Sequence, residues 1–268
     1  MNDIDEMMAL NDALGDVLMN MALCSIRLFA AFNVLPATGQ QFLHGMTRSG
    51  MVMMIGGYIA FGMPAETATA LTALQWLGLA AKETVIGLLI GFAAATVFWT
   101  AESVGALIDM QAGYNSVQLT NPLSGQQSTP VSNLLLQLVV GMFYTLGGML
   151  VFIGALFDSF KVWPLLAPLP SMASLSDLVF LHEIDRMMGM VMKFAAPVLL
   201  VLLLVDLGFG LITRAADKLE PSGLSQPVKG AVTLLLLALL AGVFIMQVRH
   251  FLVPTHLIEQ LQAWLPVR

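Results

Sequence analysis

Six long apolar runs dominate this chain and limit what it can fold into. Each approaches the roughly 20 residues with which a helix crosses the hydrocarbon core of a membrane. The runs are too long for ordinary strands, lack strict alternation, and are rich in Leu, Met and Ala, which favour helices. They cover residues 14–35, 50–62, 84–99, 134–157, 194–212 and 231–248. We therefore expect an all-α, polytopic fold of the membrane type.

Segments of mixed polarity lie between these runs and predict shorter helices. They cover residues 67–81, 101–113 and 174–193. Most prolines also fall between the runs, where they interrupt helices. Pro197 lies inside a strong run, so it either kinks that helix or occupies its first turn. We expect a single membrane domain over residues 1–268 that ends in a short amphipathic tail at residues 254–268.

Composition supports a membrane protein and excludes several classes of function. Hydrophobic residues make up 58% of the chain and charged residues only 10%, and the mean hydropathy is +0.84. A soluble domain carries about 25% charged residues, so this chain lacks the charge for an ordinary solvated surface. Its net charge of -6 and its lack of a Lys/Arg cluster argue against nucleic-acid binding. The single Cys24 excludes an internal disulfide.

Basic residues do not reveal how the chain is oriented in a membrane. Lys and Arg are spread over both alternate sets of loops, so the positive-inside rule gives no clear answer. One explanation is that a predicted segment is misplaced. The other is that some runs bury their apolar faces against partner subunits instead of crossing lipid. The small pair Gly87 and Gly91 fits close helix packing, either within the chain or at a seam between subunits.

Two carboxylates and two glycines form a stripe near the middle of the chain. If residues 102–113 are helical, Glu102, Gly105, Asp109 and Gly113 fall three or four residues apart on one face. An Asp at mid-membrane depth costs about 2.5–3.5 kcal/mol on insertion scales, so lipid disfavours this face. We therefore expect the stripe to contact other protein or a water-filled conduit.

A further carboxylate, Asp206, interrupts the run at residues 194–212. Arg214 lies about 12 Å farther along a helix, so the two side chains cannot pair directly. Each needs a partner on another helix, a backbone carbonyl or another subunit. Asp158 and Lys161 lie three residues apart at the end of another run and are close enough to pair locally.

Residues with catalytic or metal-binding potential form no recognisable set. The four histidines show no metal-ligand spacing, and the sequence contains no HExxH, GxSxG or phosphate-binding glycine motif. We expect no catalytic, cofactor or metal site, and hence no enzyme. The alternative from another functional class is a proton-coupled secondary transporter, in which Glu102, Asp109 and Asp206 would bind protons or ions. Inverted repeats would favour such a transporter, but the two halves of the sequence show no convincing match.

Three blocks of the sequence resemble the T subunits of the type III secretion export apparatus, the SctT/YscT/SpaR family that is related to flagellar FliR. The first block begins at Ala101 and reads AESVGALIDMQAGYNSVQLTNPLSGQQSTPVSNLL. The second begins at Phe157 and reads FDSFKVWPL, and the third runs from Lys193 through LLLVDLGFGLITR to SGLSQPVKG. The resemblance covers about residues 90–240. The stretches IDMQAG and STPVSNLL favour an injectisome subunit, and a flagellar FliR-type component is the nearest alternative.

This resemblance implies a core export-gate component, through which unfolded effector and needle-type substrates cross the bacterial inner membrane. One copy would assemble with the R and S subunits (SctR and SctS). It would also meet the U switch subunit (SctU) and inner rod or needle components. The protein would be multi-pass, lie within the secretion basal body, contact membrane lipid and bind no nucleic acid. Energy would come from an associated ATPase and the proton-motive force acting through other subunits.

Two sets of residues are candidate functional sites. We expect four charged side chains to make buried polar contacts that fix helix register or subunit seams; these are Glu102, Asp109, Asp206 and Arg214. The resemblance implies that the polar loop at residues 113–130 projects toward the conduit and helps to plug it. Its candidate plug residues are Gly113, Tyr114, Asn115, Gln118, Asn121, Pro122, Gly125 and Gln126. Taken alone, the composition of this loop also fits a solvated connector between helices.

Overall fold

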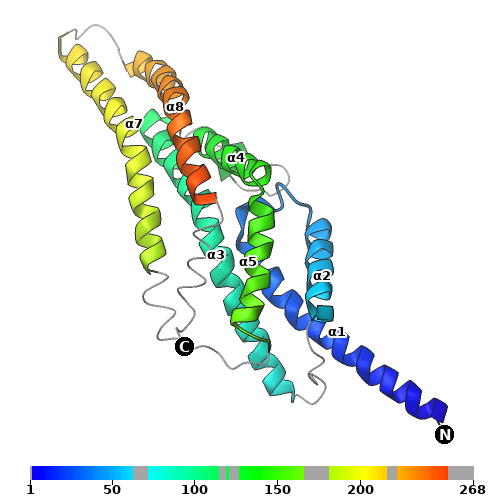
Figure 1. Cartoon of the computed structure of the whole chain (residues 1–268). Coiled ribbons are helices and arrows are strands. Elements are labelled where there is room, and N and C mark those ends of the chain that lie inside the picture. The colour runs from blue at the N-terminus through cyan, green and yellow to red at the C-terminus, as the bar shows by residue number, and fades with distance from the viewer. Residues whose placement is uncertain are drawn as a thin grey trace. The chain divides into compact units, whose positions relative to one another are not determined.

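The computed structural model describes residues 2–62, 72–114, 119–120, 127–165, 181–215 and 222–252 (Figure 1). Helices make up almost all of these residues, so the predicted all-α fold is confirmed. The helices are α1 (Asn2–Val34), the 3-10 helix η1 (Pro36–Thr38), α2 (Gly45–Gly62), α3 (Ala73–Ala112), α4 (Pro130–Thr145), α5 (Gly148–Val162), α7 (Leu181–Ala215) and α8 (Ser222–Leu252). Two short strands, β1 (Leu119–Thr120) and β2 (Gln127–Ser128), pair antiparallel between α3 and α4.

The described residues divide into two compact units. The first unit holds α1, η1, α2, the part of α3 up to Ala95 and the part of α5 from Leu150. The second holds α3 from Thr96, both strands, α4, α7 and α8. The expectation of one domain over the whole chain stays a prediction.

Several predicted boundaries differ from the structure. The run at residues 84–99 belongs to one helix, α3, together with the described part of the mixed segment at residues 67–81 and with the segment at residues 101–113, because no Pro or turn sequence separates them. The described part of the mixed segment at residues 174–193 likewise joins the run at residues 194–212 in α7. The run at residues 134–157 is divided into α4 and α5. Gly147, between them, has a φ of +77°, a left-handed conformation that glycine adopts without a steric penalty.

Among the residues that the structure describes, four helical segments are long and apolar enough to cross a membrane, as expected for a polytopic fold. They are Val17–Val34, Ala73–Ala112, Glu183–Arg214 and Ser225–Gly242. α4 and α5 add a fifth if they form one broken span, and α2 is not among the four. Pro197 lies well inside α7, so its placement in the first turn of a helix is wrong.

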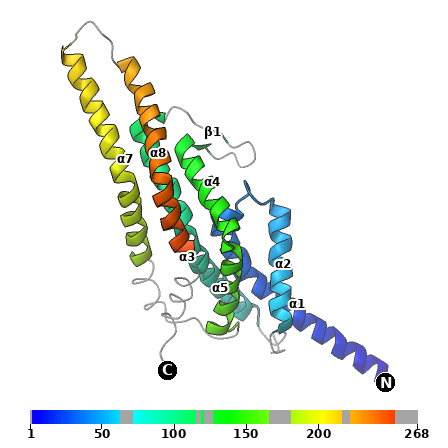
Figure 2. The ribbon, with the colours of Figure 1, turned by 45° about the horizontal axis from the view of Figure 1, so that its top comes forward.

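Small residues allow α1 and α3 to pack closely within the first unit. A Cβ atom added at Gly87 or Gly91 would collide with the backbone of Arg27 or Ala31 on α1. The two glycines therefore pack within the chain, which decides between the two roles that the sequence left open. α1 also lies beside α2 in both views (Figures 1 and 2).

In the second unit, α7 and α8 lie side by side in both views (Figures 1 and 2). Phe194 of α7 and Phe244 of α8 meet edge to face, with ring centroids 5.4 Å apart. Phe98 of α3 and Phe143 of α4 also meet edge to face, at 5.4 Å. Aromatic contacts of this geometry add to the stabilisation from buried area.

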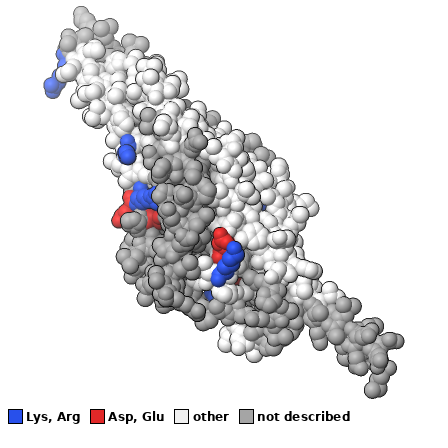
Figure 3. Space-filling view, viewed as in Figure 1, with Lys and Arg blue, Asp and Glu red and all other residues white. Residues whose placement is uncertain are grey.

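The face of the molecule shown in Figure 3 carries few charged side chains among its described residues. On this face the Lys, Arg, Asp and Glu atoms form small separate patches. Only 17% of the candidate span in α7 and 11% of that in α8 is buried. Exposed leucines on these helices include Leu200, Leu203, Leu204, Leu207, Leu211, Leu234, Leu235 and Leu239. Such faces suit membrane lipid or partner helices better than water.

We predict that Gly87→Ala destabilises the protein, because the added methyl group would collide with the Arg27 carbonyl of α1. The expected loss of unfolding free energy is about 1–3 kcal/mol, as for other overpacked sites. Gly78→Ala is the matched control, since a Cβ at that position of the same helix meets nothing within 4 Å. Thermal unfolding of the full chain in mild detergent measures both variants. Equal melting temperatures would contradict the close packing of α1 and α3.

Candidate functional site

Three charged side chains are buried together in the first unit. Arg27 of α1 and Glu83 of α3 are fully buried, and Lys82 is 2% exposed. Arg27 Nε donates a hydrogen bond to Glu83 Oε2 at 2.5 Å, and Lys82 Nζ lies 3.0 Å from Glu83 Oε1. One carboxylate therefore faces two cations, which leaves an excess of positive charge in a buried site.

Backbone carbonyls of the residues that directly follow α5 accept further hydrogen bonds from the two cations. Arg27 Nη2 donates to the carbonyl oxygen of Trp163 at 3.0 Å. Lys82 Nζ donates to those of Pro164 at 3.0 Å and Leu165 at 2.5 Å. These carbonyls directly follow the C-terminus of α5, where the helix dipole is negative, so they suit cations. The charged cluster therefore joins α1, α3 and α5.

Other contacts hold the Arg27 guanidinium in place. Its Nη1 donates to Ser159 Oγ at 3.0 Å, and its central carbon lies 3.8 Å from the centre of the Phe160 ring. Ser159 is itself fully buried and donates to the Leu156 carbonyl. Each nitrogen of the guanidinium thus donates to a specific partner and one aromatic ring packs against the group, which reduces the cost of burying it.

Our sequence interpretation missed this cluster, although the chain contained a signal for it. Arg27 interrupts the apolar run at residues 14–35, and Lys82 and Glu83 directly precede the run at residues 84–99. Charged side chains at such positions are costly unless they are paired. An isolated Arg in one run and a Lys-Glu pair beside another therefore predict a contact between the two helices.

In the second unit, Asp109 of α3 takes the place of an N-cap for α4. Its carboxylate is fully buried and accepts hydrogen bonds from the backbone N–H groups of Val131, at 2.9 Å, and Ser132, at 3.0 Å. These are the second and third residues of α4, whose N–H groups an N-cap side chain normally satisfies. Thr129 occupies the N-cap position but makes no such bond, and Pro130 follows it. The negative charge also lies at the positive end of the helix.

The predicted stripe on α3 faces α4 at two of its four residues, Gly105 and Asp109. A Cβ atom at Gly105 would fall on the backbone of Ser132, so α4 approaches α3 as closely as glycine allows. Ser132 Oγ also donates to the Glu102 carbonyl oxygen at 3.0 Å. Glu102 itself is exposed. The partner expected for the stripe is therefore, at Gly105 and Asp109, another helix of the same chain.

A second polar network joins the end of α3 to α7 and α8. Asp206 of α7 pairs with Lys229 of α8 and accepts a hydrogen bond from Gln111 Nε2 at 3.0 Å. Gln226 Nε2 donates to the Gly113 carbonyl oxygen at 3.0 Å. Asp206 thus has partners on other helices, as its distance from Arg214 along α7 required. Arg214 is exposed at the end of α7.

These contacts hold the polar loop at both of its ends. The network around Gln111 and Gly113 anchors its start, and Asp109 anchors its return at Val131 and Ser132. Gly113 has a φ of +85°, a conformation suited to glycine at the end of a helix. The predicted plug residues Asn115, Gln118, Asn121, Pro122, Gly125 and Gln126 lie outside the described residues.

The structure also shows the predicted surface ion pair and the exposure of the four predicted assembly residues. Asp158 and Lys161 pair at 2.7 Å on the surface of α5, as their spacing predicted. Of the four predicted assembly residues, Asp109 is buried within the chain, Asp206 is half-buried, and Glu102 and Arg214 are exposed. Their role at subunit seams stays a prediction. Within the described residues, no group of three or more His, Cys, Asp or Glu side chains is arranged to hold a metal ion.

The apolar outer faces, the candidate spans and the internally paired charges define a polytopic helical membrane subunit. This chain belongs to the family described as bacterial export proteins, family 1, whose model matches residues 18–253. The match confirms the predicted resemblance to the type III export T subunits and to flagellar FliR.

Three relatives illustrate the range of this family. The chain is 32% identical to Yop proteins translocation protein T of Yersinia pestis over 214 residues, which cover 80% of this chain and 82% of the relative. It is 29% identical to secretion system apparatus protein SsaT of Salmonella typhimurium over 197 residues, or 72% and 73% of the two chains. It is 27% identical to flagellar biosynthetic protein FliR of Escherichia coli over 221 residues, or 80% and 81%.

We predict that Glu83→Gln strongly destabilises the protein, because it leaves Arg27 and Lys82 buried without a counter-charge. Breaking a buried ion pair in this way costs about 3–5 kcal/mol of unfolding free energy. Asp158→Asn is the matched control, since it removes one charge from the exposed pair with Lys161 and should cost less than about 1 kcal/mol. Thermal unfolding in mild detergent compares the two. A similar small effect of both substitutions would show that the buried cluster contributes little.

Proposed function

We propose that this protein is the T-type core component of a type III secretion export gate in the bacterial inner membrane. The observation that carries the proposal is the match to the bacterial export family over residues 18–253, together with 32% identity to a Yop translocation protein. The protein acts as a non-enzymatic part of a channel for unfolded substrates. Its energy comes from other components of the apparatus.

In this proposal the chain assembles with R and S subunits and meets the U subunit and the inner rod or needle. Its weakly buried α7 and α8 expose rows of leucine that are available to partner helices or lipid. Its charged groups are largely paired within each unit, so association does not have to bury free charges there. Glu102 and Arg214, which are exposed, are the charged candidates for contacts at subunit seams.

The loop at residues 113–130 serves as part of the plug in the resting gate. Its anchored ends support this role, because they fix where the polar segment leaves and re-enters the helical unit. An uncharged polar segment offers hydrogen bonds to a passing chain without selecting the charge of that chain. The flagellar alternative keeps the same mechanism and draws on the 27% identity to FliR.

We predict that Asp109→Ala weakens assembly with the R and S subunits. The substitution removes the acceptor of the Val131 and Ser132 N–H groups, so the start of α4 and the return of the loop lose their anchor. Co-purification of tagged chain with candidate R and S subunits measures the effect, and wild-type chain should recover both partners. Asp158→Ala, which removes an exposed carboxylate, is the control. Intact complexes with Asp109→Ala at the wild-type yield would contradict the prediction.

We also predict that deleting residues 118–127 opens the gate. Because the anchors at Gly113 and Asp109 remain, the helices should still assemble while the barrier is lost. Ion leakage across the inner membrane and the amount of secreted substrate measure the outcome, and leakage should rise. Replacing the same residues by a Gly/Ser segment of equal length separates loss of the barrier from strain in a shortened loop. Unchanged leakage and secretion would remove the plug role.

A further inference from the structure

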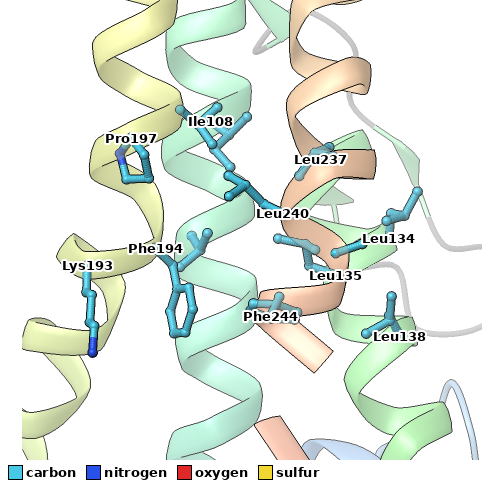
Figure 4. Close-up of a pocket in the computed structure, with 13 residues that line it drawn as sticks. Ile108, Leu134, Leu135, Leu138, Lys193, Phe194, Pro197, Leu237, Leu240 and Phe244 are labelled. Atoms are coloured by element: carbon cyan, nitrogen blue, oxygen red, sulfur yellow. The ribbon is translucent and has the colours of Figure 1, made fainter. Parts of the chain in front are cut away.

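An apolar cavity of about 210 Å³ lies among α3, α4, α7 and α8, all within the second unit (Figure 4). Its walls include Ile108 of α3, Leu135 of α4, Phe194 of α7, and Leu240 and Phe244 of α8. In another protein, an engineered cavity of about 150 Å³ with a similar apolar lining stays dry and binds benzene, because water finds no polar partners there. The chemistry of these walls therefore selects an apolar occupant.

One lining residue has a different chemistry. Lys193 of α7 is the one ionisable side chain among the described residues that line the cavity, and it is exposed. In Figure 4 its ammonium group points away from the apolar walls, beside Phe194. A lysine in this position lays its hydrocarbon stem on apolar surface and keeps its charge available to an anion. The cavity and its rim together fit an amphiphile with an apolar chain and an anionic head.

The surroundings of the cavity narrow the choice of occupant. Leu134 is 51% exposed and Pro197 is also exposed, so the lining reaches the outer surface of the unit. Three of the four helices, α3, α7 and α8, are candidate membrane spans. A helix with its side chains is about 10–12 Å across, so it is a much thicker occupant than an extended hydrocarbon chain. An acyl chain is slender enough to enter, and membrane lipid supplies it.

We propose that this cavity binds one acyl chain of an anionic phospholipid, and that Lys193 pairs with the phosphate of its headgroup. The occupant that we propose is therefore a membrane lipid. The proposal rests on the membrane location of the chain and not on the export function, so it stands or falls separately from that function. A bound lipid would fill the space between α7 and the other three helices and would stabilise their packing.

Photo-crosslinking tests the proposal with the full chain. The chain is reconstituted in vesicles of phosphatidylcholine and phosphatidylglycerol, in which the phosphatidylglycerol carries a diazirine on its acyl chain. We expect label in peptides that contain Ile108, Phe194 and Leu240. Ala241→Phe projects a ring into the cavity and should reduce this label several-fold. Ala238→Phe makes the same change at an exposed position of α8 outside the lining and should leave it unchanged.

A second pair of variants tests the rim. Lys193→Gln should lower the preference for phosphatidylglycerol over phosphatidylcholine by about threefold, the factor expected for one exposed ion pair. Arg214→Gln removes another exposed cation of the same helix and should not change the preference. Label that spreads evenly over α7 and α8 and ignores Ala241→Phe would overturn the proposal. So would loss of the label when the chain is assembled with R and S subunits, because a partner side chain would then be the occupant.

Discussion

The carboxylate of Asp109 is the interaction on which the most distinctive part of this structure depends. It reaches from α3 to the first turn of α4 and satisfies two backbone N–H groups that the N-cap residue Thr129 leaves free. The two helices are thereby fixed on either side of the polar loop. Because closing a loop costs entropy, a strong contact at its base fixes where the loop leaves α3 and where it returns to α4. The plug role proposed for this loop would need such a fixed base.

In both units, buried charged side chains contact backbone groups at, or directly next to, the end of a helix. Asp109 places negative charge at the start of α4, where the helix dipole is positive. Arg27 and Lys82 place positive charge at the carbonyls that follow α5, where the dipole is negative. A chain with only 10% charged residues has few side chains to serve as counter-ions. Backbone groups at helix ends supply the missing partners, and they leave the outer faces apolar for lipid or neighbouring subunits.

The sequence predicted the class of fold because apolar runs of membrane length and helix-favouring composition leave few alternatives. It also predicted that the stripe with Asp109 meets protein and that Asp206 needs a partner outside α7. It did not predict that Asp109 caps α4, because that contact depends on where Pro130 begins the helix and on the close approach at Gly105. It missed the cluster of Arg27, Lys82 and Glu83, since its residues come from distant helices and pairing follows only once α1 and α3 pack together. The break at Gly147 lay inside a continuous apolar run, where periodicity alone gives no boundary.

We propose that this chain is a subunit of a protein-export gate. Deletion of its gene in the bacterium that carries it tests this role most directly. Secreted proteins and swimming motility are measured together, with the gene restored as a control. We expect secretion of needle-type and effector proteins to be lost and motility to be kept. Loss of motility alone would assign the chain to the flagellum. Unchanged secretion and motility would contradict the account and return attention to a transporter built on the same apolar helices.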